Sequence, residues 1–359
     1  MNELFLERMK EMLKDEYPAY LKKLNDPARK GLRINTLKIT PDDFFAYTNY
    51  ELEKSPFAKN GYYANIKSGV GFTPEHMAGF FYIQEPSASS AVTILDPKPG
   101  MKILDMCAAP GSKSTQISEM LEQEGLLVAN EIHPTRARVL LENIERCGSA
   151  NTIVLNNDPQ DISKAFPEFF DMVLCDAPCS GEGMFRKEDQ AVEQWSLENV
   201  QACAVRQATI LNEAYKCLKP GGTMVYSTCT FAMEENEKCM LKFVQEHPDM
   251  HLVPIEVNFG RKAFDLGSHT DYARRIFPMD GGEGHFIAKL HKDGEPTEST
   301  KKVMQSQPLP KEAKEFFDTF FVKQYPYYFV KNDKVYGGIQ PFYEVGKCHL
   351  LRHQVFLGE

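Results

Sequence analysis

The stretch KILDMCAAPGSKSTQI, residues 102–117, decides the fold class of this chain. It begins as a short apolar strand, continues through a loop of small residues around Gly111, and enters a helix near Ser112. Small side chains let the backbone approach a ligand closely, and the free amides at the start of the helix point toward that ligand. This order predicts a sheet with a binding site at its carboxyl edge.

The same pattern of strand, turn and helix repeats along the chain. The apolar residues of its strands run on without alternation, which is typical of strands buried on both faces of a parallel sheet. We therefore predict an α/β fold with a Rossmann-like, mostly parallel sheet. The predicted strands cover residues 102–107, 125–132, 151–157, 170–177 and 221–228.

The regular repeat divides the chain into four parts. Residues 1–80 predict a small α+β domain, with an amphipathic helix first and a later helix capped by Thr40. Residues 81–291 hold the predicted sheet and its helices. Residues 292–311 are polar and predict a linker, and the aromatic-rich residues 312–359 predict a small C-terminal unit.

Composition indicates a soluble protein, which we expect in the cytoplasm and as a monomer. The 359 residues are 42% hydrophobic and 25% charged, and no apolar run approaches the roughly 20 residues that span a membrane. The nine cysteines are odd in number and scattered, so we expect reduced thiols, and no spacing indicates a metal site. The net charge is −9, but residues 1–40 hold nine Lys or Arg against six acids, a local excess that suits nucleic acid.

Acidic residues follow two further strands at the same edge of the predicted sheet. Glu131 ends the second strand and can accept hydrogen bonds from ribose hydroxyls, while Asp158 follows the third and can meet an adenine edge. The loop around Gly111 lacks the glycine patterns of dinucleotide and ATP sites. We therefore predict S-adenosylmethionine, a nucleoside cofactor without pyrophosphate. Taken singly, either acid could instead be a helix cap or an exposed loop residue.

The last two predicted strands end near cysteines. Asp176 and Cys179 follow one strand, Cys229 follows the next, and neighbouring strands about 5 Å apart would let both thiols face one pocket. A thiolate that adds to carbon 6 of cytosine makes carbon 5 nucleophilic. A protonated or proton-sharing carboxyl at ring nitrogen 3, for which Asp176 is the candidate, would absorb the charge. These residues predict cytosine-5 methylation and leave the roles of the two thiols open.

These motifs together resemble RNA cytosine-5 methyltransferases of the Sun type, and most closely the RsmF-like bacterial enzymes that act on ribosomal RNA. They span roughly residues 30–290. The matching stretches are RINTLK (33–38), YIQEPSA (82–88), DMCAAPGSKSTQI (105–117), NEIHPTRARVLLENIERCG (130–148), DAPCSGEGMFRK (176–187) and LKPGGTMVYSTCTFAMEENE (218–237).

The resemblance implies a class I methyltransferase fold with a seven-stranded sheet and an N-terminal RNA-binding domain. It implies that Cys229 is the nucleophile and that Cys179 aids product release. Asp176 has two expected duties, at the cofactor and at the base. The implied cofactor residues are Cys107, Ala108, Ala109, Pro110, Gly111, Ser112, Lys113, Glu131, Asp158 and Asp176. For RNA contact we predict Arg33, Arg186 and Lys187.

The substrate implied by the resemblance is RNA, with small-subunit ribosomal RNA favoured. Two alternatives are a transfer RNA cytosine-5 methyltransferase and a non-catalytic RNA-binding factor in ribosome assembly. Longer relatives carry a further C-terminal RNA-binding domain, so we expect residues 312–359 to be a shortened part of that region.

Overall fold

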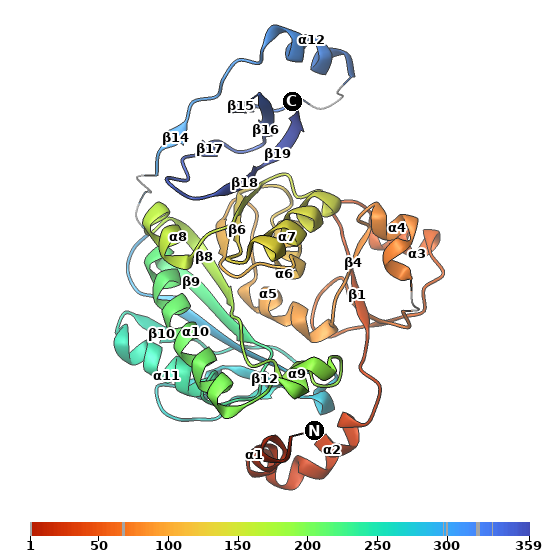
Figure 1. Cartoon of the computed structure of the whole chain (residues 1–359), viewed down its shortest axis with the longest axis vertical. Helices are drawn as coiled ribbons and strands as arrows, with labels where there is room; N and C mark the ends of the chain where they lie inside the picture. The colour runs from red at the N-terminus through yellow and green to blue at the C-terminus, as the bar shows by residue number, and fades with distance from the viewer. Residues whose placement is uncertain (1, 67–68, 297, 299–300, 321–323, 332) are drawn as a thin grey trace.

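The computed structural model describes residues 2–66, 69–296, 298, 301–320, 324–331 and 333–359. Its centre is a β-sheet covered by helices on both faces, with a small antiparallel sheet on one side and a further small β unit above it (Figure 1). The amino terminus lies at the lower end of this view and the carboxyl terminus at the upper end.

Two helices open the chain, α1 (Glu3–Leu13) and α2 (Tyr17–Leu24). As predicted, α1 is amphipathic, because Phe5, Met9 and Leu13 are buried while Asn2 caps its first turn. The predicted cap at Thr40 is also confirmed, since its side chain accepts from the amide of Asp43. A four-stranded antiparallel sheet follows, in the order β2 (Leu52–Lys54), β3 (Gly61–Ala64), β1 (Gly31–Ile34) and β4 (Phe81–Ile83), with α3 (Pro41–Tyr47) and α4 (Pro74–Met77).

The five predicted strands are all present, and they pair in parallel at the centre of the large sheet. The path through the sheet is β11 (Arg261–Lys262), β12 (Arg274–Ile276), β13 (His285–Lys292), β9 (Leu218–Thr228), β8 (Phe170–Asp176), β5 (Lys102–Asp105), β6 (Leu126–Asn130), β7 (Thr152–Leu155) and β18 (Leu350–His353), with β10 (Met250–Leu252) paired to β13. The α/β fold class is confirmed, but the sheet has 10 strands where seven were predicted. The strands β10, β11 and β18 have only two to four residues each, too few to show a sequence pattern.

Helices cover the large sheet in two layers. One layer packs through Ile162, Leu211 and Met240 and consists of α8 (Pro159–Ala165), α10 (Leu197–Cys217) and α11 (Glu237–Glu246). The opposite layer consists of α5 (Ser90–Leu95), α6 (Ser112–Met120) and α7 (Pro134–Cys147), which bury Val92, Ile117 and Leu140. Both faces of the central strands are therefore apolar, which explains their unbroken apolar runs.

The C-terminal residues form small sheets of their own and also contribute one strand to the large sheet. They contain α12 (Lys311–Phe320), a pair of short strands, β14 (Val303–Met304) with β17 (Phe342–Tyr343), and an antiparallel sheet of β15 (Tyr327–Lys331), β16 (Lys334–Gly338) and β19 (Val355–Gly358). The strand β18 from this region pairs with β7 and extends the large sheet, because the edge of β7 would otherwise present unpaired backbone groups.

None of the described helices is long and apolar enough to cross a membrane. Within the described part of the chain, no group of three or more His, Cys, Asp or Glu side chains could hold a metal ion.

Candidate active site

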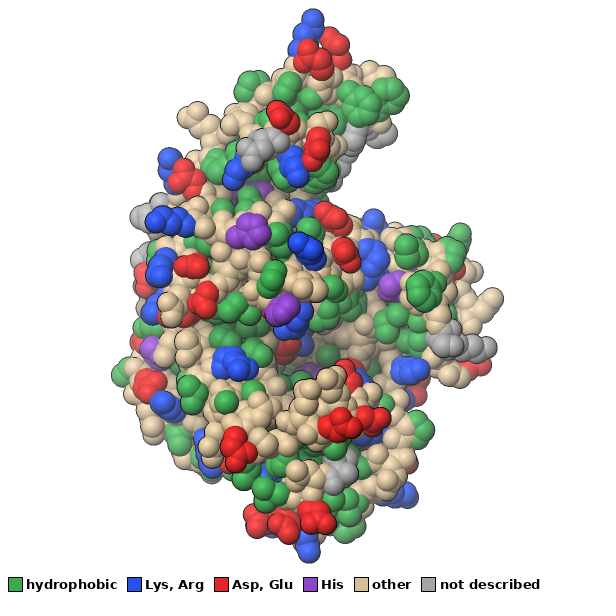
Figure 2. Space-filling model, viewed as in Figure 1, with side chains coloured by type: hydrophobic (Ala, Val, Ile, Leu, Met, Phe, Trp, Pro, Cys, Tyr) green, Lys and Arg blue, Asp and Glu red, His purple; other side chains and the backbone are tan. Residues whose placement is uncertain are grey.

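A cavity of about 800 Å³ opens at the carboxyl edge of the parallel strands. Its wall includes the loop after β5, the strand-end acids Glu131 and Asp158, and both Cys179 and Cys229. Figure 2 shows this face of the molecule hollowed above the short helix α9 (Asp189–Glu193), whose residues line the opposite wall. One cavity therefore joins the predicted cofactor site to the two thiols.

The loop after β5 turns sharply at Gly111, the residue that precedes α6. Its φ of +110° lies in a region that favours glycine, and an added Cβ would lie 3.2 Å from Leu140 Cδ1. Cys107 and Ala109 line the cavity, whereas Pro110 is exposed to solvent. Gly111 thus permits the sharp turn and close packing against α7, while the small residues Cys107 and Ala109 form this part of the cavity wall.

The two strand-end acids differ in their surroundings. Glu131 is 2% exposed, and its carboxylate accepts from the amide of His133 at 2.9 Å and lies 3.4 Å from Arg136 Nη1. Asp158 is exposed and caps α8, because its Oδ1 accepts from the amide of Gln160 at 2.9 Å. Asp158 is therefore a helix cap and part of the cavity wall at once.

A buried carboxyl lies beneath this loop. Oδ2 of Asp105 accepts from Ser114 Oγ at 2.6 Å, while its Oδ1 is buried without a hydrogen-bond partner. Burial raises the pKa of Asp105 to about 7. Among the residues that line the cavity, the small side chains of Cys107 and Ala109 and the acceptors of Glu131 fit a polar nucleoside ligand such as S-adenosylmethionine.

Asp176, at the end of β8, lies between Lys113 of α6 and Ser227 of β9. Its Oδ2 is 2.6 Å from Lys113 Nζ, and its Oδ1 accepts from Ser227 Oγ at 2.7 Å. Burial by itself would raise the pKa of Asp176, but Lys113 and these hydrogen bonds outweigh burial and lower it. Asp176 is therefore ionised at neutral pH, which corrects the protonated form considered from the sequence. The short contact with Lys113 is compatible with the proton-sharing form considered from the sequence.

The predicted proximity of the two thiols is present in the structure. The strands β8 and β9 pair in parallel with Asp176 opposite Ser227, and Sγ of Cys179 lies 3.3 Å from Sγ of Cys229. The hydrogen bond with Cys229, together with burial, raises the pKa of the Cys179 thiol well above its usual value. Cys179 thus keeps its proton and can donate it to the sulfur of Cys229.

Glu235 supports the turn that carries Cys179. Its carboxyl accepts from the amide of Ser180 at 3.0 Å, from Ser180 Oγ at 2.5 Å and from Gln207 Nε2 at 2.8 Å. Burial raises the pKa of Glu235 to about 7, although these hydrogen bonds act in the opposite direction. Because Gln207 also donates to the carbonyl of Pro178, the network fixes the residues on both sides of the thiol.

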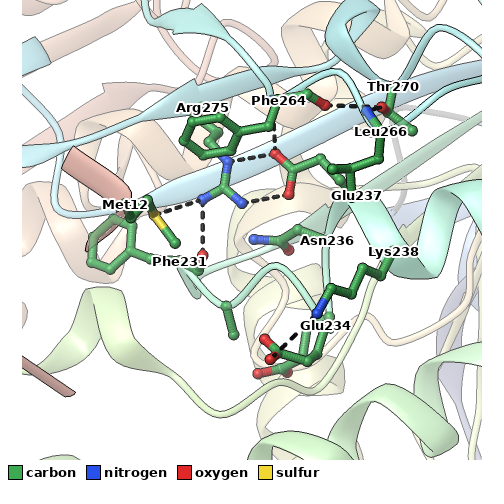
Figure 3. A network of polar contacts seen from close by, with 12 residues as sticks. Met12, Phe231, Glu234, Asn236, Glu237, Lys238, Phe264, Leu266, Thr270 and Arg275 are labelled. Atoms are coloured by element: carbon green, nitrogen blue, oxygen red, sulfur yellow. Dashed lines mark hydrogen bonds and ion pairs between the residues drawn. The ribbon is translucent and has the colours of Figure 1, made fainter. Parts of the chain in front are cut away.

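A buried ion pair holds the loop that follows Cys229 (Figure 3). Arg275 of β12 donates to both carboxylate oxygens of Glu237, at 2.6 and 2.5 Å, and to the carbonyl of Phe231 at 2.9 Å. Its Nη1 also lies 3.8 Å from Sδ of Met12 in α1. The loop that follows Cys229 is therefore attached both to the sheet and to the N-terminal helix.

The three residues predicted to contact RNA lie in different environments. Arg33 is 2% exposed, pairs with Glu119 and donates to Thr115 Oγ1 at 2.8 Å. The guanidinium of Arg186 is also buried and lies 3.0 Å from Glu283. Lys187 is exposed. In this arrangement Lys187 is open to a phosphate, while the two arginines connect parts of the chain.

Comparison with protein families gives a match over most of the chain. Residues 92–291 match the model described as 16S rRNA methyltransferase RsmB/F, and residues 1–86 match the N-terminal domain of 16S rRNA methyltransferase RsmF. The chain belongs to the RsmB/F family. The β1–β4 sheet and its helices thus correspond to the RsmF N-terminal domain, and the large sheet corresponds to the RsmB/F methyltransferase domain.

Relatives of this RsmB/F chain carry the name ribosomal RNA small subunit methyltransferase F. The protein of Vibrio cholerae is 39% identical over 321 residues, covering 86% of this chain and 68% of its own length. The protein of Escherichia coli K12 is 37% identical over 302 residues, covering 80% of this chain and 62% of its own length. The matched part of this chain thus corresponds to about two thirds of the length of each of these relatives.

Solved structures show the same fold. A methyltransferase homologue from Pyrococcus horikoshii superposes with a TM-score of 0.72 at 30% identity, covering 81% of this chain and 95% of its own. NSun6 from the same organism, solved with the ligand SFG, superposes with a TM-score of 0.70 at 22% identity, covering 82% and 99%. The RsmB/F chain therefore has the fold of S-adenosylmethionine-dependent methyltransferases, and the cofactor prediction is confirmed.

Several residues of the site were not found from the sequence. Ser227 lies inside a predicted strand, two residues before Cys229, so strand alternation alone would have placed both on one face. Glu235 and Gln207 follow no strand and belong to no spacing rule. They act here because α10 and the loop after β9 bring them behind Cys179.

Proposed function

We propose that this chain methylates carbon 5 of cytosine in RNA, with small-subunit ribosomal RNA as its substrate. The observation that carries the proposal is the pair of thiols, 3.3 Å apart, in a cavity that also includes the cofactor loop. A cofactor site alone would suit many methyl acceptors, whereas a thiol suits a ring carbon that needs covalent activation. The names of the relatives support ribosomal RNA.

In the proposed mechanism, the sulfur of Cys229 bonds to carbon 6 of the cytosine, and the electron density that this addition releases reaches carbon 5 and ring nitrogen 3. Lys113, held by Asp176, carries the proton that compensates the charge on the ring. S-adenosylmethionine, when bound, supplies an electrophilic methyl group. The residues expected to hold it are those of the loop 107–111 together with Glu131 and Asp158.

Product release returns the site to its starting state. The hydrogen on carbon 5 leaves as a proton that water accepts, and its electron pair forms the double bond between carbons 5 and 6 again. The bond between carbon 6 and sulfur breaks, and the electron pair of that bond returns to Cys229. Cys179, whose thiol keeps its proton, lies close enough to donate to the departing sulfur. This assigns Cys229 as nucleophile and Cys179 as the residue that assists release.

Two substitutions test these roles. Incubation of wild-type protein with radiolabelled S-adenosylmethionine and unmodified small-subunit ribosomal RNA should label carbon 5 of cytosine. Cys229→Ala should abolish transfer, whereas Cys179→Ala should accumulate a covalent RNA adduct that survives a denaturing gel. Cys348→Ala, which changes a thiol outside the cavity, should behave as wild type. An adduct with Cys229→Ala instead would exchange the two roles.

Other results would remove the proposal. Label on an exocyclic amine would exclude carbon-5 chemistry. Cofactor binding without any transfer would favour a non-catalytic RNA-binding factor. Bisulfite sequencing of RNA from cells with and without the gene would separate ribosomal from transfer RNA as the substrate.

We further infer that the protein acts as a monomer in the cytoplasm, where ribosomal RNA is assembled into subunits. Light scattering and cell fractionation test these two points.

A further inference from the structure

One histidine next to the active site has no place in this mechanism. His285 begins β13, which runs antiparallel to β9 with Phe286 opposite Thr228 and Ile287 opposite Ser227. The ladder ends at the pair Phe286–Thr228, and His285 and Cys229 are the residues that flank this pair on the two chains. Residues directly opposite in an antiparallel pair project to the same face of the sheet, and alternate residues share that face. His285 therefore lies on the face that carries Cys229 and Ser227.

The surroundings of His285 agree with this placement. Its side chain interacts electrostatically with both Lys113 and Asp176, the charged pair assigned to the cytosine ring. It is 6% exposed. His285 is therefore within electrostatic range of the pair that the proposed mechanism places at the base, although it comes from the antiparallel side of the sheet.

The stretch YIQEPSA fixes the hydrogen-bonding state of this histidine. Ser87 Oγ donates to Glu85 Oε2 at 2.5 Å and lies 3.1 Å from Nδ1 of His285. A hydroxyl has one proton, and that of Ser87 is used on Glu85, so the oxygen of Ser87 accepts from Nδ1. Nδ1 therefore carries the proton, and Nε2 presents a lone pair.

The remaining nitrogen is an acceptor without a partner. No described residue donates to Nε2 of His285, whereas Nδ1 is satisfied by Ser87. Burial lowers the pKa of His285 to about 4, so the imidazole is neutral at pH 7. A role confined to packing would need only the bond at Nδ1. The acceptor at Nε2 is thus available to a ligand.

Cytosine offers a matching donor. Its exocyclic amino group at carbon 4 donates hydrogen bonds, whereas uracil has an accepting oxygen at that position. We propose that Nε2 of His285 accepts a hydrogen bond from the amino group of the target cytosine, and that Glu85 and Ser87 hold the histidine in the tautomer that can do so. His285 is then a specificity-determining residue, and this inference rests on the proposed function.

A paired deletion of acceptor and donor tests the contact. The target cytosine is first mapped by bisulfite sequencing of a small-subunit ribosomal RNA transcript methylated by the wild-type protein. The same transcript is then made with pyrimidin-2-one, which lacks the amino group, at that nucleotide by splinted ligation. Wild type and His285→Phe, which keeps a ring but no acceptor, are compared on both RNAs by kcat/KM.

The expected result is a loss confined to one RNA. His285→Phe should lower kcat/KM for the cytosine RNA by about tenfold, the value of one hydrogen bond, and leave the pyrimidin-2-one RNA unchanged. The difference in ring reactivity between the two bases enters both ratios equally and cancels. His285→Gln, which restores an acceptor, should recover part of the loss, and Ser87→Ala should lose part of the preference.

The controls separate this inference from the proposed function. His291→Ala, on the same strand β13, should match wild type on both RNAs. Calorimetry of S-adenosylmethionine binding establishes that each variant is folded. Equal slowing of both RNAs by His285→Phe, with cofactor binding intact, would overturn the contact and leave the methyltransferase proposal standing. Absence of any 5-methylcytosine from the wild-type reaction would overturn both.

Discussion

The buried ion pair between Arg275 and Glu237 gives a quantitative prediction. Arg275→Met removes two hydrogen bonds to Glu237 and one to the carbonyl of Phe231. Glu237 is 0% exposed and would keep only the amide of Phe264, at 3.2 Å. Removing one partner of such a pair costs about 3–5 kcal/mol, because the other charge stays buried.

The double substitution is predicted to cost less than either single one. Glu237→Leu leaves the buried Arg275 with the carbonyl of Phe231 and Sδ of Met12 but no opposite charge, so its cost should also be about 3–5 kcal/mol. With both charges replaced by apolar side chains, no buried charge remains, and most of the loss should be recovered. At roughly 2–4 °C per kcal/mol, each single variant should melt about 6–20 °C below wild type.

Urea unfolding followed by the fluorescence of Trp195, the only tryptophan, measures these differences. Trp195 is 4% exposed and packs in the same cluster as Phe231, so it reports the loss of this region. The control is the exposed pair Lys242 and Glu246 on the same helix, 3.7 Å apart, for which about 0–1 kcal/mol is expected.

Activity should not follow stability in the double variant. The carbonyl of Phe231 lies two residues from Cys229 and would still lack the donor that Arg275 provides. We therefore expect methyl transfer to stay low although folding recovers. Additive costs of the two substitutions, or a cost of Arg275→Met below about 1 kcal/mol, would refute the assignment of a buried, coupled pair.

Three further predictions address stability and binding. Burial raises the pKa of Asp105 to about 7, so the folded chain keeps a proton that the unfolded chain releases above about pH 4. Asp105 therefore makes the free energy of unfolding fall as the pH rises from about 4 to about 7. Asp105→Asn should therefore gain more in urea midpoint over wild type at pH 7 than at pH 5, and an equal gain would contradict the pKa. Gln354→Pro removes the amide that donates to the carbonyl of Thr152 at 2.9 Å, and proline cannot adopt the φ of +58° found there. This variant should therefore detach β18 from β7 and aggregate, as measured by light scattering. Gln354→Gly, which keeps the amide and allows this φ, should aggregate less. Lys187→Ala should weaken RNA binding and reduce the slope of the logarithm of the binding constant against the logarithm of the salt concentration by about one. Arg33→Ala should chiefly lower the melting temperature. A change in the salt dependence with Arg33→Ala but not with Lys187→Ala would reverse these assignments.

The sequence predicted the parts of the fold that depend on short, continuous stretches of residues. The five central strands are buried on both faces, so their unbroken apolar runs identified them without knowledge of the rest of the chain. Parallel strands end at one edge, and this rule was enough to predict that Cys179 and Cys229 would lie together. Their separation of 3.3 Å follows from the pairing of β8 with β9.

What the sequence did not predict depends on contacts between distant residues. Arg33 and Arg186 read as exposed cations, but each is buried against a glutamate far away in the chain. The ionised state of Asp176 depends on Lys113, which a different helix brings within 2.6 Å. The strand β18 has four residues and pairs with β7 across almost the whole catalytic domain, so its own pattern could not reveal it.

The N-terminal helices have a second consequence for the active site. They do not pack on the β1–β4 sheet but on the loops that carry the thiols, with the ring of Phe5 4.8 Å from Phe185 and the ring of Tyr20 6.0 Å from Phe231. Since Phe231 is two residues from Cys229, the position of the Cys229 loop depends on how these helices pack. A substitution that loosens this packing, such as Phe5→Ala, is therefore expected to lower methyl transfer through the Cys229 loop, although none of the described residues that line the cavity comes from α1 or α2.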